Sequence, residues 1–252
     1  FLDPQAVVAA LIAFVAFSAA ASAGYVVNDM LDVERDRQHP VKSVERPLAS
    51  GALSMPAARI VLVILILSAL SAFAVLPAIA APIGAYLALT FAYSARLKHI
   101  PVVDLFAIAA GFVLRVYAGA EAIDAPVSKW AFICTLSLAL FLAATKRQQE
   151  LKVVGTDGRA VLKEYTIGLA SRYAEASAAA TVVFYSLFAL EGRPELVFTV
   201  PIVMFGLFRY WFIVETRGMG ESPTDALYRD GPLIGACLIW MSASAYAIWP
   251  SL

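Results

Sequence analysis

Charged residues are scarce in this sequence, and that scarcity excludes most soluble proteins. Only 15% of the 252 residues are Asp, Glu, Lys or Arg, while 61% are hydrophobic. A soluble domain carries about 25% charged and about 45–50% apolar residues. The chain also lacks the polar low-complexity tracts of a disordered segment and the glycine period of a fibrous protein. The mean hydropathy of +0.78 therefore indicates a protein that is embedded in a membrane.

A surplus of basic charge is also missing. The 19 Lys and Arg residues balance the 19 Asp and Glu residues, and so we expect no nucleic-acid partner. The sequence has 2 cysteines, Cys134 and Cys237. Both lie in apolar stretches, and we expect them to be core thiols. No basic segment and no small-residue cleavage site precede the first apolar stretch, so we do not expect a signal peptide there.

Long uncharged segments supply about eight candidate transmembrane helices. A helix needs about 20 apolar residues to cross the hydrocarbon core. The uncharged run 60–95 is nearly twice that length, so we expect it to fold back at Pro77, Pro82 and Gly84. The sequence thus predicts an all-α integral membrane protein with one domain, 1–252, and spans at residues 4–28, 60–95 (two helices), 102–120, 130–145, 171–190, 196–214 and 231–249.

The basic residues mark one side of the membrane. Fourteen of them lie in the connections that follow the first, third, fifth and seventh helices, whereas the other three connections hold only Lys129 and Arg193. Basic residues concentrate in cytoplasmic loops. We therefore expect a multi-pass protein of the inner (plasma) membrane whose basic loops face the cytoplasm, with both ends of the chain outside.

The first predicted helix ends in a face of carboxylates. Four polar side chains fall within an arc of about 100°, namely Asn28, Asp29, Asp32 and Asp36. The carboxylates repel one another unless a hard cation relieves them, and Mg²⁺ binds carboxylates together with phosphate oxygens. Lys42 and Arg46 follow directly and suit such phosphates. A solvated, charged helix end is the alternative interpretation.

The pattern Asn28-Asp-x-x-Asp32-x-x-x-Asp36, followed by Arg46-Pro-Leu-Ala-Ser-Gly51, resembles the first signature of the UbiA-type intramembrane prenyltransferases. The resemblance implies a UbiA-like helical bundle of nine spans around a central cavity. It also implies a Mg²⁺–diphosphate site at the cytosolic mouth and a lateral portal for lipid. The family's first helix normally precedes the helix with the aspartates, and we expect that this chain lacks it.

A second polar group joins the third and fourth predicted helices. Tyr93 and Lys98 resemble the family's Tyr-x-x-x-x-Lys loop, which leads to an acid, here Asp104, at the start of the next span. Asp104 and Arg115 share one helical face, but about 16 Å of helix axis separates them. Because charges inside a span usually face a cavity or a partner, we expect Arg115 to face an aqueous or anionic cavity. The alternatives are a buried structural cation for Arg115 and a favourable N-terminal helix charge for Asp104.

A third group, Lys146, Arg147 and Glu150, lies on one side of the fifth predicted helix, at its end. In prenyl-transferring members of the family, this place holds a second aspartate-rich motif, whereas here it is basic. The basic form resembles the branch of polyprenyl-phosphate (decaprenyl-phosphate) 5-phosphoribosyltransferases, as do segments 111–115, 164–166 and 207–210. An ordinary collar of basic residues at the membrane surface is the alternative.

The resemblance implies transfer of a phosphoribosyl group from 5-phosphoribosyl 1-diphosphate to a polyprenyl phosphate, with release of diphosphate, for synthesis of a cell-envelope arabinose donor. The expected catalytic residues are Asp29, Asp32, Asp36, Lys98 and Asp104, and the expected Mg²⁺ ligands are Asn28, Asp29, Asp32 and Asp36. The expected substrate-binding residues are Asn28, Lys42, Arg46, Tyr93, Arg115, Lys146, Arg147 and Glu150.

Two other functions stay open at this point. An aromatic prenyltransferase of the same family would use a polyprenyl diphosphate, but it would need the second acidic motif. A secondary transporter would place its site near the bilayer midplane, within repeated halves. Here the charges gather at the ends of the helices, and no repeat is visible. The sequence also leaves open whether the chain forms a homo-oligomer.

Overall fold

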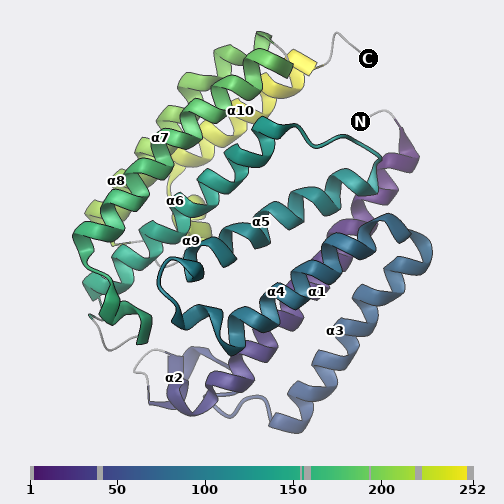
Figure 1. Ribbon diagram of the computed structural model, residues 1–252, viewed down its shortest axis with the longest axis vertical. Helices are drawn as coiled ribbons and strands as arrows, with labels where there is room; N and C mark the ends of the chain where they lie inside the picture. Colours follow the sequence, from purple (N-terminus) through teal and green to yellow (C-terminus); the bar gives the residue numbers. More distant parts are fainter. Residues whose placement is uncertain are drawn as a thin grey trace. The chain divides into compact units, whose positions relative to one another are not determined.

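The computed structural model describes residues 3–38, 42–153, 155, 160–192, 194–218 and 223–248. Helices make up nearly all of this part of the chain, and no strand occurs within it, which confirms the all-α prediction. The chain divides into two compact units, Phe1–Val127 and Ser128–Leu252, which we call unit 1 and unit 2. In Figure 1, unit 1 runs from purple to teal and unit 2 from teal to yellow.

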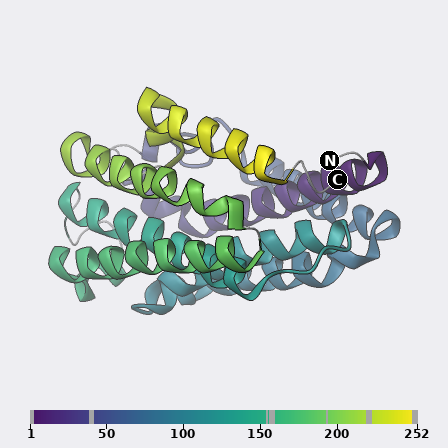
Figure 2. The same ribbon diagram turned by 90° about the horizontal axis from the view of Figure 1, so that it is seen from above.

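Unit 1 contains four long helices joined by short ones. They are α1 (Pro4–Arg37), α2 (Lys42–Glu45), α3 (Met55–Val75), η1 (Pro77–Ile79), α4 (Ala80–Ala95), η2 (Leu97–His99) and α5 (Val103–Ala122). Side-chain caps fix two starts, because Asp3 accepts from the Gln5 backbone N–H at 2.9 Å and Ser54 accepts from the Ala57 N–H at 3.4 Å. Helix α1 lies alongside α3, α4 and α5 (Figures 1 and 2).

The run 60–95 folds back as predicted, but the turn lies at one proline only. Helix α3 ends at Val75 and η1 begins at Pro77, which has no N–H to continue the helical hydrogen bonds. The prediction that Pro82 and Gly84 mark the turn is wrong, since both lie inside α4. Pro82 is tolerated there because the first helical turn needs no intrahelical N–H donors.

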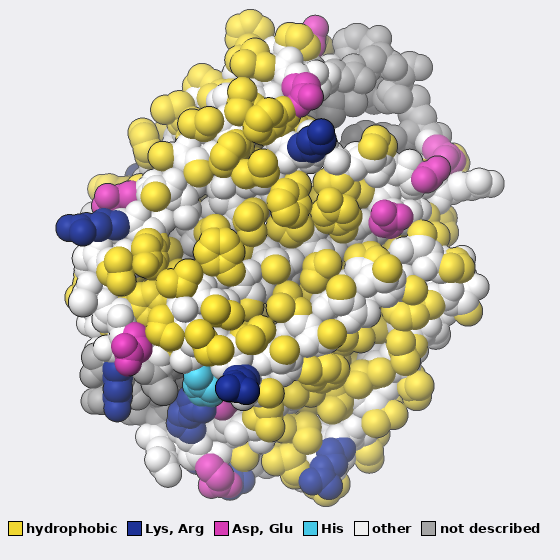
Figure 3. Space-filling view, viewed as in Figure 1, with side chains coloured by type: hydrophobic (Ala, Val, Ile, Leu, Met, Phe, Trp, Pro, Cys, Tyr) yellow, Lys and Arg dark blue, Asp and Glu magenta, His cyan; other side chains and the backbone are white. Residues whose placement is uncertain are grey.

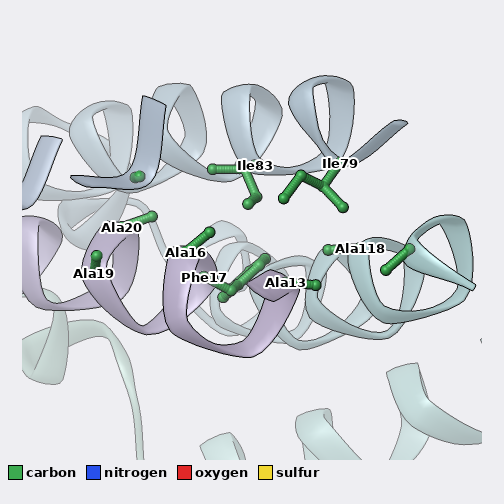
Figure 4. Close-up of a cluster of buried hydrophobic side chains, with 10 residues drawn as sticks. Ala13, Ala16, Phe17, Ala19, Ala20, Ile79, Ile83 and Ala118 are labelled. Carbon is green, nitrogen blue, oxygen red and sulfur yellow. The ribbon is translucent and has the colours of Figure 1, made fainter. Parts of the chain in front are cut away.

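The core of unit 1 is built from small side chains on α1. Ala13, Ala16 and Ala20 are buried against Ile79 and Ile83 (Figure 4). Small residues let transmembrane helices approach closely. The resulting van der Waals contacts hold the helices together in lipid, where the hydrophobic effect does not drive their association. Gly24 continues this face, and a Cβ atom there would overlap the Thr90 side chain of α4. The opposite face of α1 is left for other contacts.

In the described part of unit 2, four long helices are joined by short ones. They are α6 (Lys129–Val153), η4 (Ala160–Glu164), α7 (Ile167–Gly192), η5 (Pro194–Thr199), α8 (Val200–Arg217), α9 (Pro223–Arg229) and α10 (Gly231–Ile248). Its core includes Phe141 of α6, whose ring meets Tyr210 of α8 edge-on at 5.7 Å between centroids. Helix α7 packs along α6, and α10 along α8 (Figure 1).

The helices carry apolar surface on their outsides, as a membrane protein requires. In the described part of the chain, 7 helices are long and apolar enough to cross a membrane, and α10 is a shorter apolar helix. This agrees with the prediction of about eight. Figure 3 shows hydrophobic side chains spread over the visible surface of the helices. Water would disfavour such large apolar areas, and so the chain is an integral membrane protein.

Candidate functional site

The carboxylates of unit 1 lie on the last turns of a very long helix. Helix α1 continues for nine residues past the predicted span, from Asp29 to Arg37, so its charged end extends the same rigid helix. The predicted face is present, since Asp29, Asp32 and Asp36 follow one another at three- and four-residue spacing on an unbroken helix. Asp36 is buried, whereas Asn28, Asp29 and Asp32 are partly exposed.

Lys98 of η2 connects the second predicted group to these carboxylates. Its Nζ lies 2.8 and 2.9 Å from the two carboxylate oxygens of Asp32 and 3.2 Å from Oδ1 of Asn28. Only 6% of the Lys98 side chain is exposed. Two residues separated by 66 positions in the chain thus share one partly desolvated ion pair, in which the charge-assisted hydrogen bonds are strong.

Two arginines also pair with the carboxylates at this end of unit 1. Arg46 pairs with Asp29, and Arg35 donates to Asp32 at 2.8 Å. The sequence predicted Arg46 as a phosphate ligand but did not single out Arg35, although the i,i+3 spacing to Asp32 was a usable signal. Lys42 begins α2, but its side chain lies outside the described part of the structure. In this structure Arg46 and Lys98 neutralise carboxylates.

The oxygen donors at this end suit a hard divalent cation. Within the described residues, no group of three or more His, Cys, Asp or Glu side chains forms a ready-made metal cage. Mg²⁺ does not need one, because it takes one or two carboxylates and completes its shell with water and substrate phosphate. The carboxylate oxygens of Asp29 and Asp32 and the amide oxygen of Asn28 lie on one helix face and are ligands of the kind that Mg²⁺ prefers.

Tyr93 and Asp104 flank the Lys98 turn. Tyr93 is half-buried near the end of α4, and Asp104 is fully buried in the first turn of α5. Val102, which precedes α5, has a backbone φ of +68°, a conformation that a β-branched residue rarely adopts. Such strain tends to occur at functional sites. The turn between η2 and α5 is therefore held in a demanding conformation next to the carboxylates.

Arg115 lies deeper along α5 and is exposed, which is inconsistent with the alternative of a buried cation. Its guanidinium carbon lies 5.2 Å from the centre of the Phe17 ring on α1 and 5.3 Å from that of Phe112. Both distances are within the range of a cation–π interaction. The structure thus places Arg115 about three helical turns along α5 from Asp104, with aromatic rings that orient its guanidinium.

In unit 2, the basic group predicted on one side of a helix lies near the end of α6 and contains an ion pair. Arg147 donates to Glu150 at 2.6 Å, and only 1% of the Arg147 side chain is exposed. Lys146 is half-buried. A solvated collar should leave its arginines exposed, so the burial of Arg147 argues against that alternative. Each unit therefore has a polar group of its own, Arg147 and Glu150 in unit 2 and the carboxylate face in unit 1.

Sequence reasoning missed the buried glutamines beside Arg147. Gln148 donates through Nε2 to Glu215 at 2.9 Å and to Ser171 at 3.3 Å. The Gln148 Oε1 atom and the Gln149 Nε2 atom are buried without a hydrogen-bond partner in the described residues. Buried amides in an apolar helix are costly unless they are hydrogen-bonded. Two glutamines directly after Arg147 in such a helix were therefore a signal from which a buried polar group could have been predicted.

A second missed group joins α8 to α10. Asp230, which is buried, accepts two hydrogen bonds from Arg209, at 2.8 and 2.9 Å, and one from Arg217 at 3.3 Å. It also caps α10 by accepting from the Leu233 backbone N–H at 3.0 Å. The hydrogen bonds from Arg209 hold the pKa of the Asp230 carboxyl below its ordinary value, even though burial opposes this. In the sequence, segment 207–210, which contains Arg209, indicates only the family resemblance.

Comparisons with known proteins agree with these features. The UbiA prenyltransferase family model matches residues 1–224. Decaprenyl-phosphate phosphoribosyltransferase of Mycobacterium tuberculosis is 36% identical over 244 residues, which cover 94% of this chain and 80% of that protein. The Corynebacterium glutamicum protein of the same name is 33% identical over 263 residues, 98% of this chain and 78% of that protein.

Solved structures show the same fold. A UbiA homolog from Archaeoglobus fulgidus bound to GPP and Mg²⁺ superposes with a TM-score of 0.76 at 20% identity, over 98% of this chain and 88% of that chain. An apo UbiA homolog from Aeropyrum pernix superposes with a TM-score of 0.66 at 17% identity, over 94% and 96%. At these identities the likeness concerns the fold alone.

Proposed function

The chain belongs to the UbiA prenyltransferase family, and from that premise we propose that it is a phosphoribosyltransferase acting on a lipid phosphate. It transfers 5-phosphoribosyl from 5-phosphoribosyl 1-diphosphate to a polyprenyl phosphate and releases diphosphate, a step toward an arabinose donor for the cell envelope. The observation that carries the proposal is the buried Arg147–Glu150 pair beside Lys146, because this position is acidic in the prenyl-transferring members. Similarity to the decaprenyl-phosphate phosphoribosyltransferases supports it.

We assign binding of the donor diphosphate to the charged end of unit 1. Asp29 and Asp32, with Asn28, would hold Mg²⁺, which when bound neutralises the charge that develops on the leaving diphosphate. Arg46 and Lys98 are already fixed beside those carboxylates. When Mg²⁺ takes their place on the carboxylates, the ammonium and guanidinium groups would turn to the remaining diphosphate oxygens, to which they donate hydrogen bonds at short range.

The reaction exchanges one bond for another at the ribose C1 atom. An oxygen of the acceptor phosphate forms a bond to C1 while the bond from C1 to the diphosphate oxygen breaks, and the diphosphate keeps the electron pair. The sugar passes through an oxocarbenium-like state. Because the acceptor is already an anion, no side chain has to remove a proton. The chemistry therefore needs cations and positioning, which agrees with a site rich in Lys and Arg.

Lys146 and Arg147 hold a phosphate of one substrate in this proposal. Arg147 is rigidly positioned by Glu150, and a guanidinium can bind a phosphate through two parallel hydrogen bonds. Glu150 thus acts by orienting Arg147. In this proposal the protein spans the inner membrane, and the charged ends of its helices face the cytoplasm, where a water-soluble sugar donor is available. The concentration of basic residues in the loops on one side supports this orientation.

A product assay tests this function directly. Purified protein in nanodiscs is incubated with radiolabelled 5-phosphoribosyl diphosphate, Mg²⁺ and one lipid acceptor at a time. We expect label to move into the lipid phase with a polyprenyl phosphate and not with a polyprenol or an aromatic acceptor. A parallel reaction supplies a labelled polyprenyl diphosphate and an aromatic acceptor. Product from that reaction alone would replace this proposal by aromatic prenyl transfer.

A further inference from the structure

Helix α1 carries a polar stripe that continues from the carboxylates into the apolar part of the helix. Ser18, Ser22, Tyr25 and Asp29 fall within an arc of about 60° at about 100° per residue. The three hydroxyl-bearing residues are exposed, Tyr25 to 70%. They lie on the side of α1 that is opposite to the alanine face packed in the core of unit 1. Hydroxyls placed along an exposed helix face in this way indicate a polar ligand or water.

Arg115 contacts α1 at the level of Ser18, the innermost hydroxyl of the stripe, although it does so through the core-facing Phe17. Its guanidinium packs on Phe17, the residue before Ser18, and on Phe112. Tyr86 of α4 lies against the same Phe17 ring, with 4.5 Å between centroids, and its hydroxyl interacts with Arg115 and Thr90. Among the described residues no carboxylate pairs with Arg115. The exposed guanidinium is thus oriented by aromatic rings and has donors left over.

A guanidinium with unused donors at this depth requires an anion or water. Arg115 is the thirteenth residue of α5, so about 18 Å of helix axis separate it from the start of that helix. Charges at such positions within spans face a cavity or a partner. Long helical side chains tilt toward the N-terminus of their helix, and the contact with Phe112 shows this tilt. The guanidinium therefore points back toward the end that carries Asp29 and Lys98.

We propose that Arg115, with the hydroxyls of Tyr25 and Tyr86, binds the phosphate head group of the lipid acceptor. The inference rests on the proposed function and names the acceptor site within it. In a single displacement the acceptor attacks C1 on the face opposite to the leaving group, with reacting atoms about 3 Å apart. An acceptor phosphate must then lie on the membrane side of a donor whose diphosphate is held by the carboxylates. Arg115 is the cation on that side of unit 1.

The same face of α1 also suits the rest of an amphiphilic ligand. Beyond Ser18, the stripe continues as Phe14 and Leu11, which are 70% and 58% exposed. An acceptor lipid has one anionic group followed by a long apolar chain, and the face offers a cation and hydroxyls followed by apolar side chains. The donor has no apolar part. This order of side chains therefore favours the lipid phosphate over either phosphate of the sugar donor.

Binding of a lipid in the absence of donor tests the inference without relying on turnover. A labelled polyprenyl phosphate and the polyprenol of equal chain length are titrated into protein in nanodiscs. Wild type should prefer the phosphate, and Arg115→Met should weaken phosphate binding by about tenfold to hundredfold, as expected for a charge-assisted contact. Polyprenol binding should not change. Arg115→Lys should recover part of the loss, since it restores the charge but not the planar fork.

Steady-state kinetics separate the two substrates. Arg115→Met should raise the KM for the lipid by the same factor while the KM for phosphoribosyl diphosphate stays within about twofold. Arg59→Met is the matched control, because Arg59 is an exposed arginine of α3 with no place in the proposed site, and it should match wild type. Tyr25→Phe removes only an oxygen and should weaken phosphate binding by about twofold to tenfold, which tests the site should Arg115→Met fail to fold.

The outcomes distinguish this inference from the proposed function. A folded Arg115→Met protein with unchanged lipid binding would overturn the inference, as would a rise in the donor KM alone. Absence of any preference of wild type for the phosphorylated lipid would also overturn it. Arg115-dependent binding of the phosphorylated lipid by a wild-type protein that forms no phosphoribosyl lipid would support the acceptor site and refute the proposed donor.

Discussion

Replacing Lys98 by methionine should impair both stability and turnover, for separate reasons. Methionine keeps most of the volume but removes the ammonium that holds both carboxylate oxygens of Asp32 and the Asn28 amide. A hydrogen bond to a charged group contributes about 1.5–3 kcal/mol. Asp32 keeps Arg35 and some solvent contact, so we expect the lower part of that range, about 2 kcal/mol, or roughly 4–8 °C in Tm.

Lys152→Met provides the matched control for stability. Lys152 also makes a short ion pair, at 2.6 Å to Glu215, but both partners are substantially exposed, with 31% and 39% of their side chains accessible. Exposed pairs contribute at most about 1 kcal/mol. A fluorescence-monitored thermal unfolding experiment in one detergent should therefore rank Lys98→Met clearly below Lys152→Met, which should stay close to wild type.

Adding Asp32→Asn to Lys98→Met separates the two effects. The neutral amide does not need a cation beside it, so the double variant should unfold at a higher temperature than Lys98→Met alone. Turnover should fall by about 10²–10³ in Lys98→Met, as for loss of one preorganised donor to a developing charge, and it should not recover in the double variant. If Lys98→Met retains wild-type turnover and a Tm equal to that of Lys152→Met, the Lys98–Asp32 pair is not a functional element.

Four further predictions concern other parts of the structure. Asp29→Asn, or excess chelator with wild type, should abolish phosphoribosyl transfer while size-exclusion profiles stay unchanged; full activity with chelator would exclude a divalent metal. A cysteine introduced by Ser43→Cys should resist membrane-impermeant thiol reagents in intact cells, and labelling from outside would reverse the proposed orientation. Arg147→Ala should raise the KM of one phosphate-bearing substrate by about tenfold to hundredfold, with Arg147→Lys recovering only part; unchanged KM values for both substrates would make Arg147 structural. The pKa of Asp230 is lowered in the folded state, so its contribution to stability is present above the ordinary aspartate pKa and is lost as the pH falls through the folded value. The difference in Tm between wild type and Asp230→Asn should therefore close in acid. A difference that widens in acid would contradict this.

The positions of the spans followed from the sequence, but two helix ends did not. Hydropathy marks where apolar residues stop, whereas a helix stops where its hydrogen bonds do. Helix α6 therefore continues from Thr145 to Val153, because the residues after Thr145 are good helix formers and Arg147 pairs with Glu150 within the helix. The same reasoning explains why α1 continues to Arg37, where i,i+3 pairs such as Arg37–Glu34 support its exposed turns.

Site residues that share one helix could be grouped from the sequence, whereas contacts between helices could not. The arc of Asn28, Asp29 and Asp32 follows from the helical repeat alone. The contact of Lys98 with Asp32 spans 66 positions, and that of Gln148 with Glu215 spans 67. Such contacts depend on how helices pack, and the single-helix repeat carries no information about that. The stacking of Arg115 on Phe17 belongs to the same class.

The alanine face of α1 makes this protein unusual in its response to mutation. In most cores the damaging substitutions remove atoms and leave a void. Ala13, Ala16 and Ala20 have only a methyl group to lose, so nearly every replacement at these positions adds atoms between helices that are already in contact, which forces backbone shifts. Gly24, which faces Thr90, has nothing to lose at all. Natural variation along this face should therefore be confined to the smallest side chains.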